Sequence, residues 1–172
     1  GRTDASEVYQ RQPLFFTTVK ADKEKTSVVV LADVHNGSAK IGSLLKDVRF
    51  DEMDFLVTNG DFVGTFNKEE DLFDGGIDTL TDLFASSKPV YIVRGNHETR
   101  GTMAPVFKNY FYFPENKFYY TFNSGTTLFL VLDCGEDKPD SDKEYSDLVD
   151  FDGYRSQEVR WLKQVVASEK FK

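Results

Sequence analysis

Three short polar runs in this sequence contain side chains that divalent metal ions prefer as ligands. Residues 32–35 read Ala-Asp-Val-His, residues 59–61 read Asn-Gly-Asp, and residues 94–98 read Arg-Gly-Asn-His-Glu. The two histidines of the chain, His35 and His97, both lie within these runs. Carboxylate, imidazole and amide groups supply the oxygen and nitrogen ligands of manganese, iron and zinc. The runs together therefore predict a metal-binding site.

The elements that must position these residues are predicted from the apolar segments before each run. Uninterrupted apolar stretches predict β-strands over residues 26–31, 53–58 and 89–94, each buried on both faces. Two helices are expected between them, one capped by Ser38 and one opened by a capping box of Asn67 and Glu70. This alternation of strands and helices is the pattern of a parallel sheet with right-handed crossovers, so the expected fold class is α/β.

Apolar spacing also predicts which side chains of the two helices are buried. In the first helix the apolar positions are Ile41, Leu44, Leu45 and Val48. In the second they are Leu72, Phe73, Ile77, Leu80, Leu83 and Phe84. The Gly75-Gly76 pair is expected to weaken the second helix and split it, because glycine has low helix propensity.

The segments before and after these strands and helices predict the domain boundaries and the other elements of the chain. Residues 1–13 are expected to be a lead-in, and residues 14–172 a single domain. A further strand is expected over residues 14–19, and a β-hairpin over residues 117–122 and 126–133. Residues 135–152 read as an acidic loop, and residues 154–170 as a helix. This last helix is expected to present Val159, Leu162 and Val166 on one face.

The predicted topology brings the polar runs to a common place. Ligands of open α/β sheets bind outside the carboxyl ends of the strands, where Asp33, Asp61 and Asn96 are all expected. Asp33 and His35 could grip one ion, and Asp61 could bridge two ions roughly 3.5 Å apart. Asn96 would supply a neutral carbonyl oxygen to the second ion. His97 is better placed as a general acid towards a leaving group.

In this order and each after a buried strand, the motifs Asp-Val-His (33–35), Gly-Asp (60–61) and Gly-Asn-His-Glu (95–98) resemble the calcineurin-like metallophosphoesterase superfamily. The resemblance implies a β-sandwich flanked by helices, with a dinuclear metal centre. It implies hydrolysis of a phosphoric mono- or diester, in which a metal-bound hydroxide attacks phosphorus in line with the departing alcohol.

The resemblance also implies a role for each site residue. Asp33 and His35 would hold the first metal, Asp61 would bridge, and Asn96 would hold the second. His97 would protonate or stabilise the departing alcohol. A basic residue beside the last motif, Arg94 or Arg100, would contact the substrate phosphate.

One departure from the family pattern concerns the metal ligands. The family has two further histidine motifs downstream, whereas no histidine follows His97 in this chain. We therefore expect the N-terminal portion of such a domain, incomplete at its C-terminus. The first metal then keeps three ligands and the second only two. We hypothesise that the chain by itself is inactive, and a non-catalytic binding or scaffold module that retains the fold is the alternative.

Composition limits the partners. The net charge of −8 disfavours nucleic acid as a partner, because the phosphate backbone would be repelled. No apolar stretch approaches membrane-spanning length, and Cys134 is the single cysteine, so no internal disulfide can form and the compartment stays open. An incomplete sandwich would expose an apolar sheet face, which predicts self-association.

Overall fold

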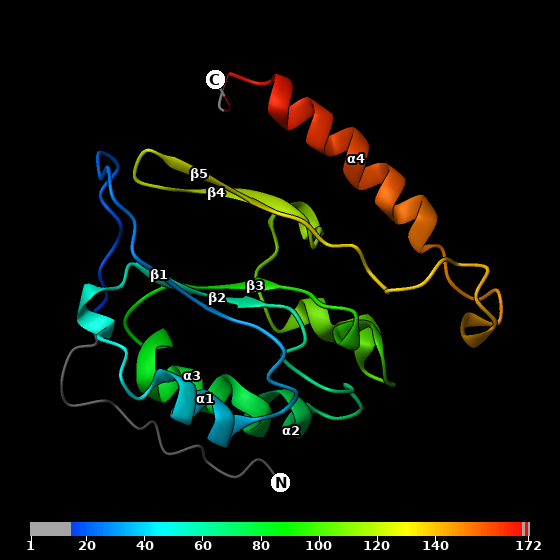
Figure 1. The fold of residues 1–172 in the computed structure, drawn as a ribbon, viewed down its shortest axis with the longest axis horizontal. Helices are drawn as coiled ribbons and strands as arrows, with labels where there is room; N and C mark the ends of the chain where they lie inside the picture. Colours follow the sequence, from blue (N-terminus) through cyan, green and yellow to red (C-terminus); the bar gives the residue numbers. More distant parts are fainter. Residues whose placement is uncertain (1–14, 170, 172) are drawn as a thin grey trace, which may run out of the picture.

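The computed structural model describes residues 15–169 and residue 171, so the expected lead-in over residues 1–13 lies outside the described part. Figure 1 shows the layers of the fold. A helical layer covers one face of a parallel sheet, a β-hairpin covers the other face, and a long C-terminal helix lies beyond the hairpin. The expected α/β class and sandwich-like layering are confirmed. Among the described residues, no helix is both long and apolar enough to cross a bilayer.

The parallel sheet has the order β1-β2-β3, with β1 (Val28–Leu31), β2 (Phe55–Asn59) and β3 (Val90–Val93). All three strands follow the prediction. Central strand β2 pairs with both neighbours, and Val57 lies opposite Val30 on one side and Tyr91 on the other. The register ends at Asn59 and Val93. The carboxyl ends of the strands therefore lie side by side at one edge of the sheet.

Strand β1 is not buried on both faces, which corrects the prediction. Val28 is 36% exposed and Val30 is 56% exposed. The cause is the position of the hairpin, whose rings lie over the other two strands. Phe122 of the hairpin stacks on Tyr91 of β3 with centroids 3.6 Å apart, and Phe129 contacts Phe55 of β2 at 5.2 Å. Self-association through the uncovered part of this sheet face stays a prediction, which light scattering would measure.

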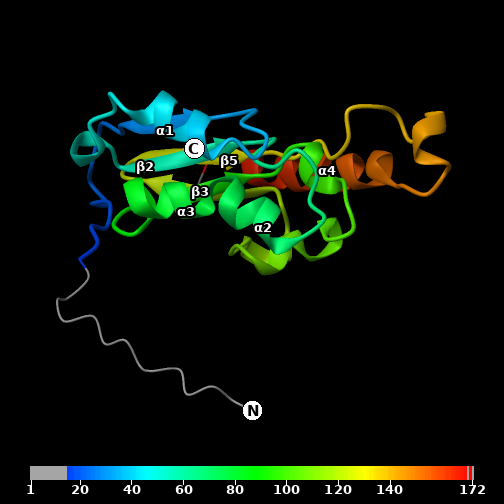
Figure 2. The ribbon, with the colours of Figure 1, turned by 90° about the horizontal axis from the view of Figure 1, so that it is seen from below.

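The helical layer consists of α1 (Ser38–Leu45), α2 (Glu69–Leu72) and α3 (Asp78–Leu80), with π-helical turns at Phe73–Ile77 and Thr81–Ala85. Figure 2, seen from the helical side, shows α1 running beside the α2–α3 segment. The side chains buried against the sheet and its loops are Ile41, Leu45, Leu72, Leu80 and Phe84.

Three apolar side chains predicted to be buried in this layer are exposed. Leu44 is 61% exposed, Phe73 is 37% exposed and Leu83 is 39% exposed. The wider π-helical turns shift the angular position of the residues within them, so the 3.6-residue period fails for Phe73 and Leu83. The expected split at the glycine pair is confirmed, because the backbone of Gly76 leaves the helical region there.

Both predicted N-caps are displaced. Gly37 is the N-cap of α1, and the Ser38 hydroxyl instead donates a hydrogen bond to the Asp74 carbonyl. Helix α2 is capped one residue later than expected, at Lys68, where the Asp71 carboxylate accepts from the Lys68 amide at 3.1 Å. The Asn67 side-chain oxygen is occupied elsewhere, because it accepts from the backbone N–H of Thr102.

The hairpin prediction is confirmed by antiparallel strands β4 (Tyr120–Ser124) and β5 (Thr127–Val131). Residues 15–19 form no strand, which corrects that prediction. Thr17 donates one backbone hydrogen bond to Ser87 at 3.3 Å, and Phe15 and Phe16 extend into solvent at 79% and 77% exposure. No strand of the described chain pairs with this segment, so its apolar residues have no sheet to join.

Helix α4 (Phe151–Ala167) begins earlier than predicted, and only part of its predicted face is covered, because Leu162 and the neighbouring Trp161 are half-buried. Val159 and Val166 are 48% and 43% exposed. The inward residues are Glu158, which accepts from the backbone of Asp133, and Trp161, whose ring contacts Tyr119. Polar and aromatic contacts, rather than an aliphatic stripe, therefore hold α4 against the sandwich.

Candidate metal centre

Backbone hydrogen bonds join the loops that follow the three strands. The amide of Asp33 donates to Gly60 O at 3.1 Å, and the amide of His35 donates to Asp61 O at 3.0 Å. Gly60 N donates to Val93 O at 3.0 Å. Asp33, His35 and Asp61 adopt left-handed backbone conformations, with φ of 59°, 47° and 52°. Such conformations are uncommon for non-glycine residues and cluster at functional sites.

Two glycines allow the loops after β2 and β3 to approach each other closely. Gly60 has a φ of +81°, and a Cβ built on it would lie 3.1 Å from the Cα of Gly95. A Cβ on Gly95 would lie 2.3 Å from Asp61 Oδ1 and 2.4 Å from Asp61 N. Any side chain at residue 95 would therefore displace the Asp61 carboxylate.

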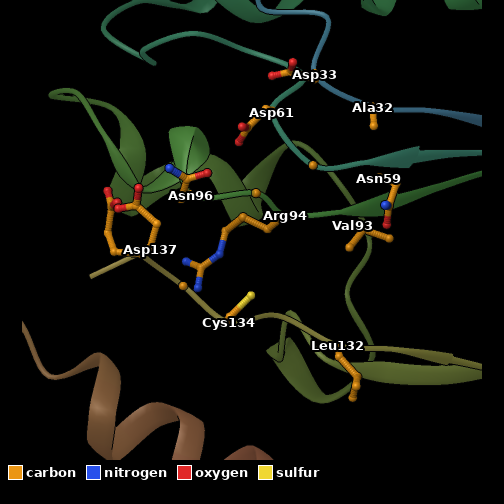
Figure 3. A pocket seen from close by; sticks show the side chains of 14 residues that line it. Ala32, Asp33, Asn59, Asp61, Val93, Arg94, Asn96, Leu132, Cys134 and Asp137 are labelled. Carbon is orange, nitrogen blue, oxygen red and sulfur yellow. The ribbon is translucent and has the colours of Figure 1, made fainter. Parts of the chain in front are cut away.

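The predicted ligands lie at this edge of the sheet, although the Asp33 side chain is 75% exposed and is not part of the cluster of His35, Asp61 and His97. Asp33 Oδ1 lies 2.6 Å from His35 Nε2, and Asp61 Oδ2 lies 3.9 Å from the same nitrogen. Figure 3 shows Asp33, Asp61 and Asn96 around one pocket, which has a volume of about 350 Å³. The pocket is also lined by Arg94, Cys134, Glu136 and Asp137.

The Asn96 amide lies directly against the Asp61 carboxylate. With its nitrogen towards Asp61, the amide donates to the two carboxylate oxygens at 3.1 and 3.3 Å, and its oxygen accepts from Arg100 Nη2 at 2.7 Å. Rotating the amide by half a turn brings its oxygen to the same distance from the carboxylate. Two acceptors that close repel each other unless a cation lies beside them. With its nitrogen inward the amide satisfies both neighbours without a cation, so a ligand role for the Asn96 oxygen requires the amide to turn and give up its contact with Arg100.

His97 is fixed by both ring nitrogens. Nδ1 lies 2.5 Å from Gly64 O, which can only accept, so Nδ1 carries the proton and Nε2 accepts from Arg100 Nη1 at 3.1 Å. The rings of His97 and His35 are 4.3 Å apart in an edge-to-face arrangement. One ligand atom from each of His35, Asp61 and His97 lies within 4.8 Å of the others. The sequence interpretation treated His97 as an acid, yet the structure also brings it within reach of a metal at Asp61.

Glu98 is a site residue to which the sequence reasoning gave no role. Its side chain is buried, and it accepts hydrogen bonds from the backbone amides of Asp61, Val63 and Gly95. Burial raises the pKa of the Glu98 carboxyl, and the Asp61 charge raises it further, while these backbone hydrogen bonds oppose the rise. The position of Glu98 in the Arg-Gly-Asn-His-Glu run indicates that it lies near the site. Its hydrogen-bond partners are backbone groups, which the sequence does not reveal.

Both arginines expected near a substrate phosphate are engaged by carboxylates. Arg94 Nε lies 2.7 Å from Asp133 Oδ2, and Arg100 donates to the two oxygens of Glu136 at 2.9 and 2.8 Å. Burial alone would raise the pKa of Glu136, but hydrogen bonds from Arg100 and Thr99, with the Arg100 charge, lower it to about 2. The Arg94 and Arg100 charges are thereby compensated within the protein, and contact with a substrate phosphate stays a prediction.

The chemistry of the donor set suits a divalent cation. Two carboxylates, an imidazole and an amide from three separate loops converge, and oxygen and nitrogen ligands of this mixture are accepted by manganese, iron and zinc. A parallel α/β sheet that delivers such ligands to its carboxyl edge defines a candidate metalloenzyme.

The comparison with known families agrees with this class. Residues 26–170 match the family described as calcineurin-like phosphoesterase. Because the match spans most of the chain, the protein belongs to the calcineurin-like phosphoesterase family, and the resemblance noted in the sequence is confirmed. No curated protein matches the chain. Membership supports metal-dependent phosphoester hydrolysis as the class of chemistry.

Proposed function

We propose that the chain is the metal-binding part of a phosphoesterase that hydrolyses a phosphoric mono- or diester. The convergence of Asp33, His35, Asp61 and Asn96 at one sheet edge carries the proposal. The family match over residues 26–170 supplies the reaction class. The net charge of −8 would repel a phosphorylated substrate, so cations at this edge are needed to reverse the local field.

In the proposed site, Asp33 and His35 hold the first ion, Asp61 lies between two ions, and Asn96 serves the second. The central position of Asp61 supports this assignment, because its carboxylate lies near His35 on one side and against the Asn96 amide on the other. When bound, divalent ions of this kind neutralise phosphoryl charge and lower the pKa of water.

His97 is proposed to assist the departing alcohol. The Gly64 carbonyl holds Nδ1 and so orients the ring, and Nε2, which accepts from Arg100, would have to take up a proton before it could give one to a leaving group. Arg100 donates to Nε2, while its charge is compensated by Glu136. A metal-ligand role is the competing assignment for His97, supported by its place in the cluster with His35 and Asp61.

Manganese binding tests the site directly. Calorimetric titration of the chain with Mn²⁺ should show binding that falls by about tenfold or more in Asp61→Asn, because a carboxylate ligand is lost. Asp82→Asn, an exposed carboxylate on the helical layer, is the matched control and should bind normally. In His97→Gln, unchanged Mn²⁺ affinity would support the acid role, whereas a parallel loss of affinity would support ligation.

Hydrolysis of p-nitrophenyl phosphate and bis(p-nitrophenyl) phosphate tests the reaction. Turnover that requires Mn²⁺ and is lost in Asp61→Asn would support the phosphoesterase and contradict the hypothesis that this chain alone is inactive. Mn²⁺ binding without turnover of either ester would agree both with the hypothesis that this chain alone is inactive and with the non-catalytic module.

A further inference from the structure

Glu98 is a buried carboxylate whose partners are all backbone amides. It is 1% exposed, and no Lys, Arg or His of the described chain forms an ion pair with it. Burial of a carboxylate is unfavourable unless hydrogen bonds compensate for the lost water. Here Oε1 accepts from Val63 at 2.9 Å, and Oε2 accepts from Gly95 at 2.6 Å and Asp61 at 3.1 Å. The three bonds offset part of that cost.

The three amides belong to two different loops. Asp61 and Val63 follow β2, and Gly95 follows β3. The β2–β3 register ends at Asn59 and Val93, so the strand ladder no longer ties the two chains together beyond that point. After the bond from Gly60 N to Val93 O, Glu98 supplies the next connection. A hydrogen bond in the opposite direction also joins the two loops, because Asp61 Oδ1 accepts from the backbone N–H of His97 at 3.1 Å.

We infer that Glu98 is a positioning residue that keeps Asp61 and Asn96 at ligand distance by joining the loops after β2 and β3. The inference rests on the proposed metal-binding function. Glu98 accepts from the backbone N–H groups of Asp61 and Gly95. These two groups lie on either side of the contact between the Asp61 carboxylate and the Asn96 side-chain amide. Without it, the Asp61 turn, which has a left-handed backbone, loses a tether on its own N–H.

Glu98→Gln tests the inference with little change in shape. The amide keeps one acceptor oxygen, but its NH₂ group then faces a backbone N–H, so at least one of the three bonds is lost. Glu158→Gln is the matched control, since Glu158 is also buried and accepts a backbone amide, that of Asp133, in helix α4. Amide hydrogen exchange and calorimetric Mn²⁺ titration are the two measurements, made on the full chain.

In Glu98→Gln we expect exchange at Asp61, Val63 and Gly95 to accelerate and Mn²⁺ affinity to fall by about tenfold or more, as for other groups that orient metal ligands. The Glu158→Gln control should leave both unchanged. Unaltered exchange at these amides, or faster exchange with full Mn²⁺ affinity, would overturn the inference. Absence of Mn²⁺ binding by the unaltered chain would instead overturn the proposed function, and exchange would still decide whether Glu98 joins the loops.

Glu98→Asp covers the case in which the amide variant does not fold. It keeps the negative charge but shortens the side chain by one methylene, so it cannot reach both loops at once. The same exchange pattern and loss of Mn²⁺ affinity are expected in a chain whose circular dichroism is native. Mn²⁺ affinity equal to that of the unaltered chain would refute the need for a carboxylate of this length.

Discussion

Arg94 and Asp133 form an ion pair that joins the last metal-site loop to the segment before helix α4. The Asp133 side chain is completely shielded from solvent, and Arg94 is 11% exposed. Asp133 also accepts from the Tyr154 hydroxyl of α4 at 3.1 Å and from the Gly135 amide at 2.7 Å. The guanidinium of Arg94 lies 3.8 Å from the centre of the Phe118 ring. The pair thus anchors α4 to the loop that carries Asn96.

Removing one member of this pair should destabilise the fold strongly. Asp133→Ala leaves the Arg94 charge buried without its partner, which typically costs about 3–5 kcal/mol. Glu52→Ala is the control, because Glu52 pairs with Arg49 at 2.6 Å on the surface, where such pairs contribute about 1 kcal/mol or less. Urea unfolding followed by the fluorescence of Trp161 measures both changes. Equal losses in the two variants would contradict the assigned importance of the buried pair.

Gly95→Ala should damage the metal site through sterics alone. The added methyl would overlap Asp61 Oδ1 and N, so the loops after β2 and β3 must separate. We expect a loss of about 1–3 kcal/mol in unfolding free energy, as in other overpacked sites, together with weaker Mn²⁺ binding. Urea unfolding and calorimetric titration provide the measurements.

Gly42→Ala is the control for that substitution. Residue 42 lies in helix α1 with nothing within 4 Å of an added Cβ, and alanine has the higher helix propensity. Its unfolding free energy should rise by about 0.5–1 kcal/mol, with Mn²⁺ affinity unchanged. A Gly95→Ala variant that behaves like this control would show that the loops do not need their close approach.

The positions of the metal-site loops could be predicted from sequence because strand ends are local signals. Uninterrupted apolar runs before Asp33, Asp61 and Asn96 predict buried parallel strands, and such strands must end at one edge. What periodicity could not predict was which neighbours cover each element. The exposure of Val30 depends on where a hairpin nearly a hundred residues later docks, and the exposure of Phe73 depends on a π-helical turn.

Polar contacts of the site were predicted least well. Residue types predict that Asp33 and His35 can share a cation, and the two side chains do meet. The backbone partners of Glu98, and the pairing of Arg100 with Glu136, depend on loop geometry that has no periodic signal. Such contacts emerge only once the chain is folded.

The Arg100–Glu136 pair should make stability depend on pH. The folded pKa of Glu136, about 2, lies below the ordinary value of 4.5, so its contribution is complete above pH 4.5 and is lost as pH falls towards 2. Allowing for solvent screening of Arg100, which is 35% exposed, this contribution is about 2 kcal/mol at neutral pH. In Glu136→Gln the unfolding free energy should be lower at pH 7, and the difference from the unaltered chain should shrink by pH 3.

Urea unfolding at pH 7, 5 and 3 measures this dependence. Glu70→Gln, an exposed carboxyl in α2, controls for the general effect of removing one negative charge. If the unaltered chain and Glu136→Gln lose stability in parallel between pH 5 and pH 3, the ion pair does not lower the pKa of Glu136 in solution.

Thr58 should be replaceable by valine without loss. It lies in central strand β2 at 1% exposure, and among the described residues its Oγ1 is buried without a hydrogen-bond partner. An unsatisfied buried hydroxyl is unfavourable, and valine has nearly the same shape, so Thr58→Val should raise the unfolding free energy by about 1 kcal/mol. Thr26→Val is the matched control, because Thr26 Oγ1 lies 3.3 Å from the Ser124 hydroxyl, and losing that contact should lower stability. Thermal unfolding of both variants separates the cases, and a Thr58→Val chain that melts below the unaltered chain would mean that its hydroxyl has a partner in solution.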